Sequence, residues 1–495
     1  MSKSKRTISA SVLALTLGHA SQSGATEPLA AYVLLGQTAA GKQIALARVV
    51  IDQPNASCPS LEPFAEDGEG SVRAMQPRRS PNPDNFPVTV CEAVYPRDGS
   101  SLRISGSELK LPRVPAKPSR IAVIGDTGCK PKYQHSCKGN AHWPFREMAD
   151  SAAGTEPDLV LHMGDYNYRG TPGKIDIREQ TGKVKKVHVY DAGDNAPGVT
   201  CTLAGPYYGQ NSPGSETPDS WKAWKKDFFE PGARLLSAAP WVLARGNHEL
   251  CSRAGPGWFY FLDPGTDLLD GGSGQLACPP AESPEPVIFR EPYRVDLGGL
   301  SLILLDSANA CDQGDLHQKH FDAQFARIQT LVGEAPAGNA IWLQSHRPLW
   351  GLNKPRGGEA KSALDTSGRY AVIDRTLQTA LAAYPLPKPI HLVLSGHMHL
   401  FQSIDFKPPS VLPTQLILGN GGVELDDNAI EGAVSAQIRG ADAVGFGSGT
   451  FGWMEIRLND GGQWSSRMFD RKGSTLVRCD SARMSGTGAC EPIGH

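Results

Sequence analysis

Polar side chains that can bind metal ions recur directly after predicted apolar strands. They stand in five short motifs: Gly125-Asp126-Thr127-Gly128, Gly164-Asp165-Tyr166-Asn167-Tyr168, Gly246-Asn247-His248-Glu249, Ser345-His346 and Gly396-His397-Met398-His399. The glycine before most of these polar residues allows a tight turn and a close backbone approach. The candidate ligands are Asp126, Asp165, Tyr168, Asn247, His346, His397 and His399. Seven ligands exceed what one ion needs, so the set predicts two ions about 3.5–4 Å apart that share a bridging carboxylate.

The donor types narrow the choice of metal and of reaction. Mixed oxygen and imidazole donors suit Fe, Mn or Zn better than Ca, and a phenolate such as that of Tyr168 suits Fe(III). Two-metal sites of this kind are used for phosphate-ester cleavage. A single Gly-Asp could be an ordinary turn, and His397 with His399 could be packed in a core. The five motifs together favour a metal site over a coincidence.

The elements that must position these motifs alternate between short apolar strands and helices. Strands are predicted at Ile121–Ile124, Leu159–Met163, Trp241–Ala244, Leu300–Leu305, Ala340–Leu343, Ile390–Leu394 and Gln415–Leu418. Helices are predicted at Pro144–Ala153, Ser220–Phe229, Leu316–Val332 and Val372–Tyr384. Such alternation is typical of the α/β class, in which ligands lie at the ends of the strands.

The composition shifts along the chain and predicts four parts. Residues 1–25 have the layout of a signal peptide: Lys3, Lys5 and Arg6, then an apolar stretch, then Ser23-Gly24-Ala25. The alternative is a frayed cytosolic N-terminus. We expect an N-terminal β-sandwich-like domain at 26–117, a catalytic domain at 118–470 and a Cys-bearing tail at 471–495. Within the catalytic part, residues 169–218 have the composition of an insertion, in which 174–178 and 184–190 are predicted to pair as a hairpin.

Charge and cysteine content restrict the partners and the compartment. The 495 residues hold 49 Lys and Arg against 51 Asp and Glu, a net charge of −2, which argues against a nucleic-acid surface. After the leader, no apolar run approaches the ~20 residues of a membrane span. Ten cysteines in a secreted chain favour disulfides. Proximity suggests the pairs Cys58–Cys91, Cys129–Cys137, Cys251–Cys278, Cys479–Cys490 and, by elimination, Cys201–Cys311, although spacing proves no connectivity. A thiolate ligand role for Cys129 is the alternative to its disulfide.

These motifs resemble those of the calcineurin-like metallophosphoesterases and, within them, of the purple acid phosphatases. The wider family begins with Asp-x-His, and here Gly128 occupies the position of that histidine. Purple acid phosphatases replace the lost ligand with the tyrosine of Gly-Asp-x-x-Tyr, which matches Tyr168. The resemblance covers about residues 118–470. It implies a four-layer α/β/β/α sandwich preceded by a small β-sandwich-like domain. The signal-peptide layout and the cysteines predict that this enzyme is secreted, to the periplasm or the extracellular space.

The resemblance also assigns roles to the ligands. It makes Asp126, Tyr168 and His399 ligands of a ferric ion and Asp165 the bridging carboxylate. It makes Asn247, His346 and His397 ligands of a divalent ion, which is Fe, Zn or Mn. Tyr166 is the competing phenol, and we expect it to serve in packing.

The implied activity is hydrolysis of a small-molecule phosphomonoester by a metal-activated hydroxide. His248 resembles the catalytic histidine that contacts the phosphate or helps to protonate the leaving group, and Asn247 contacts the substrate too. Glu249 would lie behind the ligands and orient His248. A phosphodiesterase or nucleotide hydrolase is the alternative, followed by a non-catalytic binding protein on this fold.

One departure from the purple acid phosphatase pattern concerns the substrate. No further histidine follows His346 until His391. Arg347 is our candidate for binding the phosphate instead, and the other basic residues of this stretch are Lys354, Arg356 and Lys361. Each of these four could equally be a solvated surface residue.

Four other residues have simpler interpretations. We expect His162 to be a hydrogen-bonded core histidine. His317 and His320 should lie on a helix surface. Asp306, at the end of Leu-Leu-Asp-Ser, should be a turn residue or lie behind the ligands.

Overall fold

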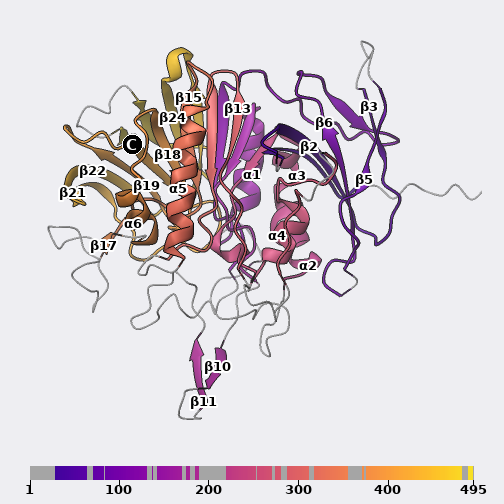
Figure 1. Ribbon diagram of the computed structural model, residues 1–495, viewed down its shortest axis with the longest axis horizontal. Coiled ribbons are helices and arrows are strands. Elements are labelled where there is room, and N and C mark those ends of the chain that lie inside the picture. The colour runs from indigo at the N-terminus through magenta and orange to yellow at the C-terminus, as the bar shows by residue number, and fades with distance from the viewer. Residues whose placement is uncertain are drawn as a thin grey trace, which may run out of the picture.

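The computed structural model describes most of the chain after residue 27 (Figure 1). The described residues are 28–493 without 39, 64–70, 83, 131–136, 138–141, 170–173, 179–183, 189–218, 252, 270–273, 280–286, 312–316, 355–370, 373–374 and 482–488. The predicted leader and Cys201 therefore lie outside the described residues.

Two large mixed sheets form the centre of the protein. Among the described residues, the first sheet has the order β26-β25-β24-β23-β8-β9-β12-β1-β2-β6-β5, and the second has the order β13-β14-β15-β18-β20-β19-β22-β21. The strands of the first sheet are β1 Ala30–Gln37, β2 Gln43–Ile51, β5 Gln76–Pro77, β6 Thr89–Tyr95, β8 Arg120–Ile124, β9 Leu159–His162, β12 Trp241–Leu243, β23 Gly452–Leu458, β24 Trp464–Asp470, β25 Thr475–Asp480 and β26 Cys490–Pro492. Those of the second are β13 Tyr293–Leu297, β14 Leu300–Leu305, β15 Ala340–Ser345, β18 Ile390–Ser395, β19 Phe401–Phe406, β20 Thr414–Leu418, β21 Gly432–Ile438 and β22 Ala441–Ser448.

Helices cover the outer faces of both sheets (Figure 1). They are α1 Phe145–Gly154, α2 Trp221–Trp224, the π-helix η2 Lys225–Phe229, α3 Glu230–Ala238, the short turn η3 Asn247–Glu249, α4 Gly255–Phe261, α5 Gln318–Gly333, α6 Arg375–Ala383 and the turn η5 Asp460–Gly462. Apolar residues of α1 to α4 pack on the first sheet, and those of α5 and α6 pack on the second. A third apolar cluster, which includes Val123, Leu161 and Trp342, fills the space between the sheets. The predicted α/β/β/α sandwich is confirmed.

The helix expected at Ser220–Phe229 is longer than the sequence indicates. It runs through α2 and η2 and continues as α3 to Ala238. The prediction stops before Pro231, which is a usual helix breaker. In the structure, Pro231 stands in the first turn of α3, directly after the π-helical turn η2, and the helix continues past it.

The expected N-terminal β region is present and is continuous with the first sheet. Strand β1 pairs in parallel with β12 and antiparallel with β2, and β2 pairs with β6. Strands β3 Ser60–Pro63, β4 Arg73–Ala74 and β7 Leu102–Ile104 form a small sheet of their own. Nearly all residues of β1 and β2 are buried, so both faces of these strands pack against other parts of the protein. The first sheet runs through both the N-terminal region and the catalytic region. The domain boundaries predicted at 25, 117 and 470 stay predictions.

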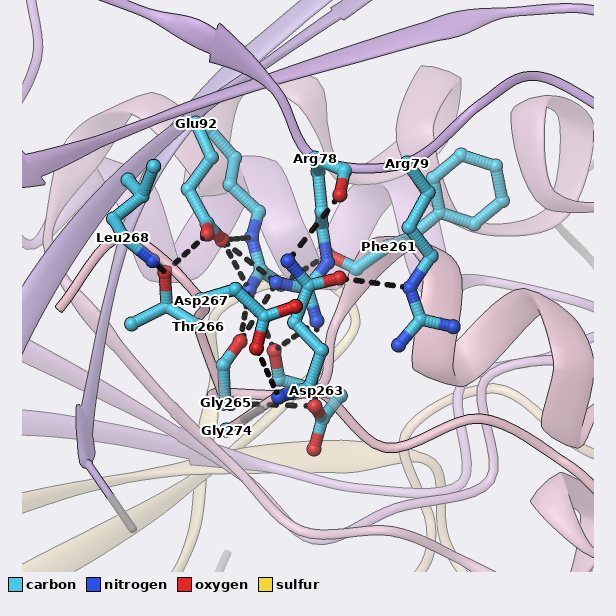
Figure 2. A network of polar contacts seen from close by, with 12 residues as sticks. Arg78, Arg79, Glu92, Phe261, Asp263, Gly265, Thr266, Asp267, Leu268 and Gly274 are labelled. Carbon is cyan, nitrogen blue, oxygen red and sulfur yellow. Dashed lines mark hydrogen bonds and ion pairs between the residues drawn. The ribbon is translucent and has the colours of Figure 1, made fainter. Parts of the chain in front are cut away.

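A buried polar network fastens the N-terminal strands to the segment after α4 (Figure 2). Arg48 and Arg78 both bind the carboxylate of Glu92, with N–O distances of 2.6 and 2.8 Å. Arg48 also donates to the carbonyl of Phe261 at 2.7 Å, and Arg78 donates to the carboxylate of Asp263 at 3.3 Å. The first of these acceptors is the last residue of α4, a helix that begins shortly after the Asn247 motif. The N-terminal strands therefore help to hold that helix in place.

The predicted hairpin within the insertion is present, and so are four of the predicted disulfides. Strands β10 Lys174–Arg178 and β11 Val184–His188 pair antiparallel, as do β23 and β24. The disulfides are Cys58–Cys91, Cys129–Cys137, Cys251–Cys278 and Cys479–Cys490. Two residue pairs, β16 Leu352–Asn353 and β17 Ala371–Val372, form a further short ribbon. No helix of the described residues is long and apolar enough to span a membrane.

Candidate metal centre

The five motifs meet where the two sheets end. Parallel pairing aligns the ends of β8, β9 and β12 in the first sheet and those of β15 and β18 in the second. The motifs with Asp126, Asp165 and Asn247 follow the first three strands, and those with His346 and His397 follow the other two. Carboxyl ends of parallel strands are the usual place for ligands in α/β folds.

Unusual backbone angles aim three of these side chains. Asp126, Asp165 and His397 have φ values of 55°, 59° and 70°. This left-handed conformation costs a residue with a side chain roughly 1–2 kcal/mol. Residues held in such conformations cluster at active sites and ligand clamps, where the surrounding structure overrides the strain.

Glycines make the close packing of the motifs possible. A Cβ atom on Gly246 would lie 2.1 Å from Oδ1 of Asp165, and one on Gly396 would lie 2.3 Å from Oδ2 of Asp126. Neither position has room for a side chain. The glycines of the motifs are therefore required by contacts between loops as well as by tight turns.

Tyr168 joins the first group of candidate ligands. Its hydroxyl oxygen lies 3.1 Å from Oδ1 of Asp126, 3.0 Å from Oδ2 of Asp165 and 3.1 Å from Nε2 of His399. One hydroxyl proton cannot serve three acceptors at once. We call Asp126, Tyr168 and His399 the tyrosine group.

Asn247 joins the second group. Its side-chain oxygen lies 2.7 Å from Nε2 of His346 and 2.8 Å from Nδ1 of His397. Oδ1 of Asp165 lies 3.4 Å from Nε2 of His346. We call Asn247, His346 and His397 the asparagine group. Asp165 thus turns one oxygen toward each group, which is the position that a bridging carboxylate requires.

The tautomer of His346 suits a metal ion. Its Nδ1 lies 2.7 Å from the carbonyl oxygen of Met163, so Nδ1 carries the proton and donates it. Nε2 then presents a lone pair to the oxygens of Asn247 and Asp165. Burial lowers the pKa of His346 to about 4, which keeps a second proton off the ring. Lone pairs that converge without a proton between them fit a metal cation.

The electrostatics of the site agree with this fit. Burial, with the charge of Asp165 beside it, raises the pKa of Asp126 well above its ordinary value. Burial and the charges of Asp126 and Asp165 raise the pKa of Tyr168. Such shifts mean that negative charge is poorly stabilised unless a positive ion is present. Among the described residues, Asp126, Asp165 and His346 form a group whose ligand atoms lie within 4.8 Å of one another.

Glu249 is buried behind the ligands, but it does not contact the His248 ring as we expected. Its carboxylate accepts backbone N–H groups of Asp165 at 3.0 Å, Tyr166 at 2.8 Å and Gly246 at 3.1 Å. A backbone clamp of this kind fixes the Asp165 loop against the Asn247 loop. The carboxylate thus satisfies a row of buried amide groups, and an orienting role toward His248 stays a prediction.

His248 lies beside the tyrosine group and next to a cation that the sequence analysis missed. Its ring centroid is 3.9 Å from that of Tyr168, and Nη1 of Arg253 lies 3.1 Å from both ring nitrogens. Burial and the positive charges of Arg253 and Lys130 lower the pKa of His248 well below its ordinary value. Both cations follow motifs closely in sequence, and that proximity was the available signal.

The basic residues proposed for phosphate occupy different places. Arg347 is fully buried, with Nη1 2.9 Å from Nε2 of His397, so it contacts a candidate ligand. Lys354 is exposed, and Arg356 and Lys361 lie outside the described residues. A substrate role for Arg347 stays a proposal.

The interpretations of Tyr166 and His162 are confirmed, whereas His317 precedes α5 and is only partly exposed, like His320. Tyr166 is buried, donates to the carbonyl of Ala244 at 2.9 Å and stacks on His162. His162 lies 2.9 Å from Oγ1 of Thr127 and accepts the N–H of Gly164. Neither is among the candidate ligands. His320 stacks on Phe289 at the partly exposed start of α5, as His317 does edge-on.

The fold and the site together define a metallophosphoesterase. A family model for calcineurin-like phosphoesterases matches residues 119–401, more than half of the 495 residues. The chain therefore belongs to the calcineurin-like phosphoesterase family.

Two solved structures are similar at low identity. A purple acid phosphatase, PPD1, from seeds of yellow lupin (Lupinus luteus), is 14% identical with a TM-score of 0.49, over 90% of this chain and 72% of that chain. GAP50, the anchor in the inner membrane complex of Plasmodium, is 13% identical with a TM-score of 0.37, over 74% of this chain and 88% of that chain. No curated protein matches the chain.

Proposed function

We propose that this protein is a secreted phosphomonoesterase of the purple acid phosphatase type, with two metal ions. The observation that carries the proposal is the position of Asp165, whose two oxygens face the tyrosine group and the asparagine group. The tyrosine group would hold Fe(III), and the asparagine group would hold divalent Fe, Zn or Mn. Four disulfides fit an oxidising compartment such as the periplasm or the extracellular space.

When bound, a pair of metal ions polarises the phosphate ester and stabilises the negative charge of the transition state. The protein supplies the position and the proton. Asn247 and His248 lie on the same turn, so the turn that carries a ligand also aims the imidazole at the substrate. The lowered pKa of His248 keeps the ring neutral until a phosphate dianion arrives, and the negative charge of the ester then favours protonation. A protonated His248 can hydrogen-bond the phosphate and donate to the leaving oxygen.

Metal analysis, a visible spectrum and an activity assay on the purified chain test the proposal. We expect two metal ions per chain, a tyrosinate–Fe(III) absorption band and hydrolysis of a chromogenic phosphate monoester. A parallel assay with the bis-ester of the same chromophore separates a phosphodiesterase from a monoesterase. A colourless, active enzyme that contains only zinc or manganese would contradict the iron assignment. A chain with well under two ions would favour a binding protein.

Asp165→Asn is the sharpest variant for this site. It keeps the size of the side chain and removes the charge that both groups share. We expect activity to fall by more than about 100-fold, because removing one such electrostatic contact typically costs that much. Wild-type activity in this variant would refute the proposed mechanism.

A further inference from the structure

Two residues that are not candidate ligands stand beside the site at the end of β14. Asp306 and Ser307 follow this strand of the second sheet, next to β15, which carries His346. Both are buried, with 7% and 0% of their surface exposed. Their polar contacts reach the two loops that carry Asn247 and His346.

Asp306 binds the residue just before the Asn247 motif. Its Oδ1 lies 3.1 Å from Nε of Arg245, and its Oδ2 lies 2.8 Å from Nη2. Two parallel bonds to a planar guanidinium fix its orientation as well as its position. Nη2 of Arg245 also donates to the carbonyl of Ile288 at 2.7 Å. Arg245 follows β12 of the first sheet by two residues, so this ion pair links the two sheets.

The rest of the Asp306 carboxylate is held by the backbone. Oδ2 accepts the N–H of Arg290 at 2.8 Å, and Oδ1 accepts that of Ala308 at 3.3 Å. The carboxylate therefore has fixed donors on the main chain and on Arg245. A side chain held in this way cannot change rotamer without breaking several buried hydrogen bonds.

Ser307 holds the other loop. Its Oγ accepts the N–H of Arg347 at 2.9 Å and lies 2.9 Å from Oγ of Ser345. Ser345 in turn lies 2.8 Å from the carbonyl oxygen of Arg347. These contacts fix the positions of Ser345 and Arg347, the residues on both sides of His346.

We propose that Asp306 and Ser307 are positioning residues for the asparagine group. Asn247 comes from the first sheet and His346 from the second, so the separation of their donor atoms depends on a tie between the sheets. Asp306 fixes the loop before Asn247, and Ser307, its neighbour, fixes the loop around His346. The inference rests on the proposed function, because it states that these contacts between the sheets determine the affinity of the asparagine group for its metal ion.

The test measures metal affinity rather than activity alone. Metal-stripped protein is titrated with Zn²⁺, Mn²⁺ or Fe, and the dissociation constants of the two ions are compared between variants. The variants are Asp306→Asn and Ser307→Ala. The matched control is Glu455→Gln on β23, another carboxylate that is 2% exposed and paired with three arginines, at 2.8, 2.9 and 3.7 Å.

We expect Asp306→Asn to weaken the affinity for one metal ion about 10–100-fold, as changes in the partners of metal ligands do. The affinity for the other ion should stay within threefold of the wild-type value. Ser307→Ala should act on the same ion to a smaller extent. Glu455→Gln should lower the unfolding temperature and leave both affinities unchanged. Wild-type affinity for both ions in Asp306→Asn, or an equal loss of both, would overturn the inference.

One further variant, Arg245→Lys, keeps the test decisive. If circular dichroism shows that Asp306→Asn does not fold, Ser307→Ala and Arg245→Lys decide the question in the same titration. Lysine keeps the charge but cannot form the two parallel bonds. Selective loss of one ion supports the inference, and retention of both overturns it. Failure of the wild type to bind two ions would instead refute the proposed function.

Discussion

Replacing Glu92 by Gln should destabilise the protein far more than an ordinary surface change. Glu92 is the anion shared by Arg48 and Arg78, whose side chains have no exposed surface, while its own side chain is 1% exposed. Removing one partner of a buried ion pair costs about 3–5 kcal/mol, since the other charge stays buried without compensation. Carbonyl groups of Phe261 and Asp263 still accept from Arg48 in the variant, so we expect a value near the lower end, about 3 kcal/mol.

Urea unfolding at pH 7, followed by tryptophan fluorescence, measures this effect. The matched control is Glu62→Gln, which breaks an ion pair to Arg103 of similar length, 2.7 Å, between side chains that are 27% and 43% exposed. Exposed pairs contribute about 0–1 kcal/mol. A loss in Glu92→Gln as small as that in Glu62→Gln would refute the view that the network fastens the N-terminal strands.

Comparing the wild type with Glu92→Gln at different pH values gives a second prediction, on how stability depends on pH. Burial alone would raise the pKa of Glu92, but the charges of Arg48 and Arg78 bring this pKa below its ordinary value. A carboxyl group with a lowered folded-state pKa stabilises the protein above its unfolded-state pKa, and this contribution is lost as the pH falls through the folded-state value. The stability difference between wild type and Glu92→Gln should therefore be constant near neutrality and shrink in acid.

Three further outcomes are expected. Arg253→Met should raise KM for a phosphate monoester about tenfold with metal content unchanged, because a cation next to His248 is removed; an unchanged KM would contradict this role. Gly246→Ala should impair metal binding and activity, since its Cβ would lie 2.1 Å from Oδ1 of Asp165. The control Gly333→Ala, at an open position in α5, should be neutral or should stabilise the protein by up to about 1 kcal/mol. Equal activity in the two variants would show that the loops can move apart. Removing metal with a chelator should lower the unfolding temperature, because the buried carboxylates lose their counter-ion, and restoring metal should reverse the change; identical curves would argue against metal binding to the folded state.

The candidate ligands could be found from the sequence because each one follows a strand within a few residues. A local pattern such as Gly164-Asp165 contains both the turn and the donor, so no knowledge of the tertiary structure is needed. The α/β class was predictable because apolar strands and helices alternate along the chain, whereas the four layers were implied only by the resemblance to the purple acid phosphatases.

The residues around the ligands could not be predicted in this way. Asp306 and Arg245 are 61 positions apart, and nothing in either neighbourhood indicates the other. The contacts of Glu249 with backbone amide groups were not predicted, because the sequence cannot show which buried amide groups need a partner. From its sequence Arg347 could have been a surface cation, and its buried contacts with Ser307 and His397 come from segments that lie about 40 and 50 positions away in the chain.

The shared first sheet has a consequence for any attempt to isolate the catalytic part. Of the strands described in that sheet, only β8, β9 and β12 lie within residues 119–401, which match the family. A fragment cut to those residues would expose β8 where β23 now pairs and β12 where β1 now pairs. Open edges of apolar strands invite pairing with other chains and aggregation. The strands on either side thus serve as a covering for the catalytic strands, and their loss would appear as insolubility before any effect on chemistry could be measured.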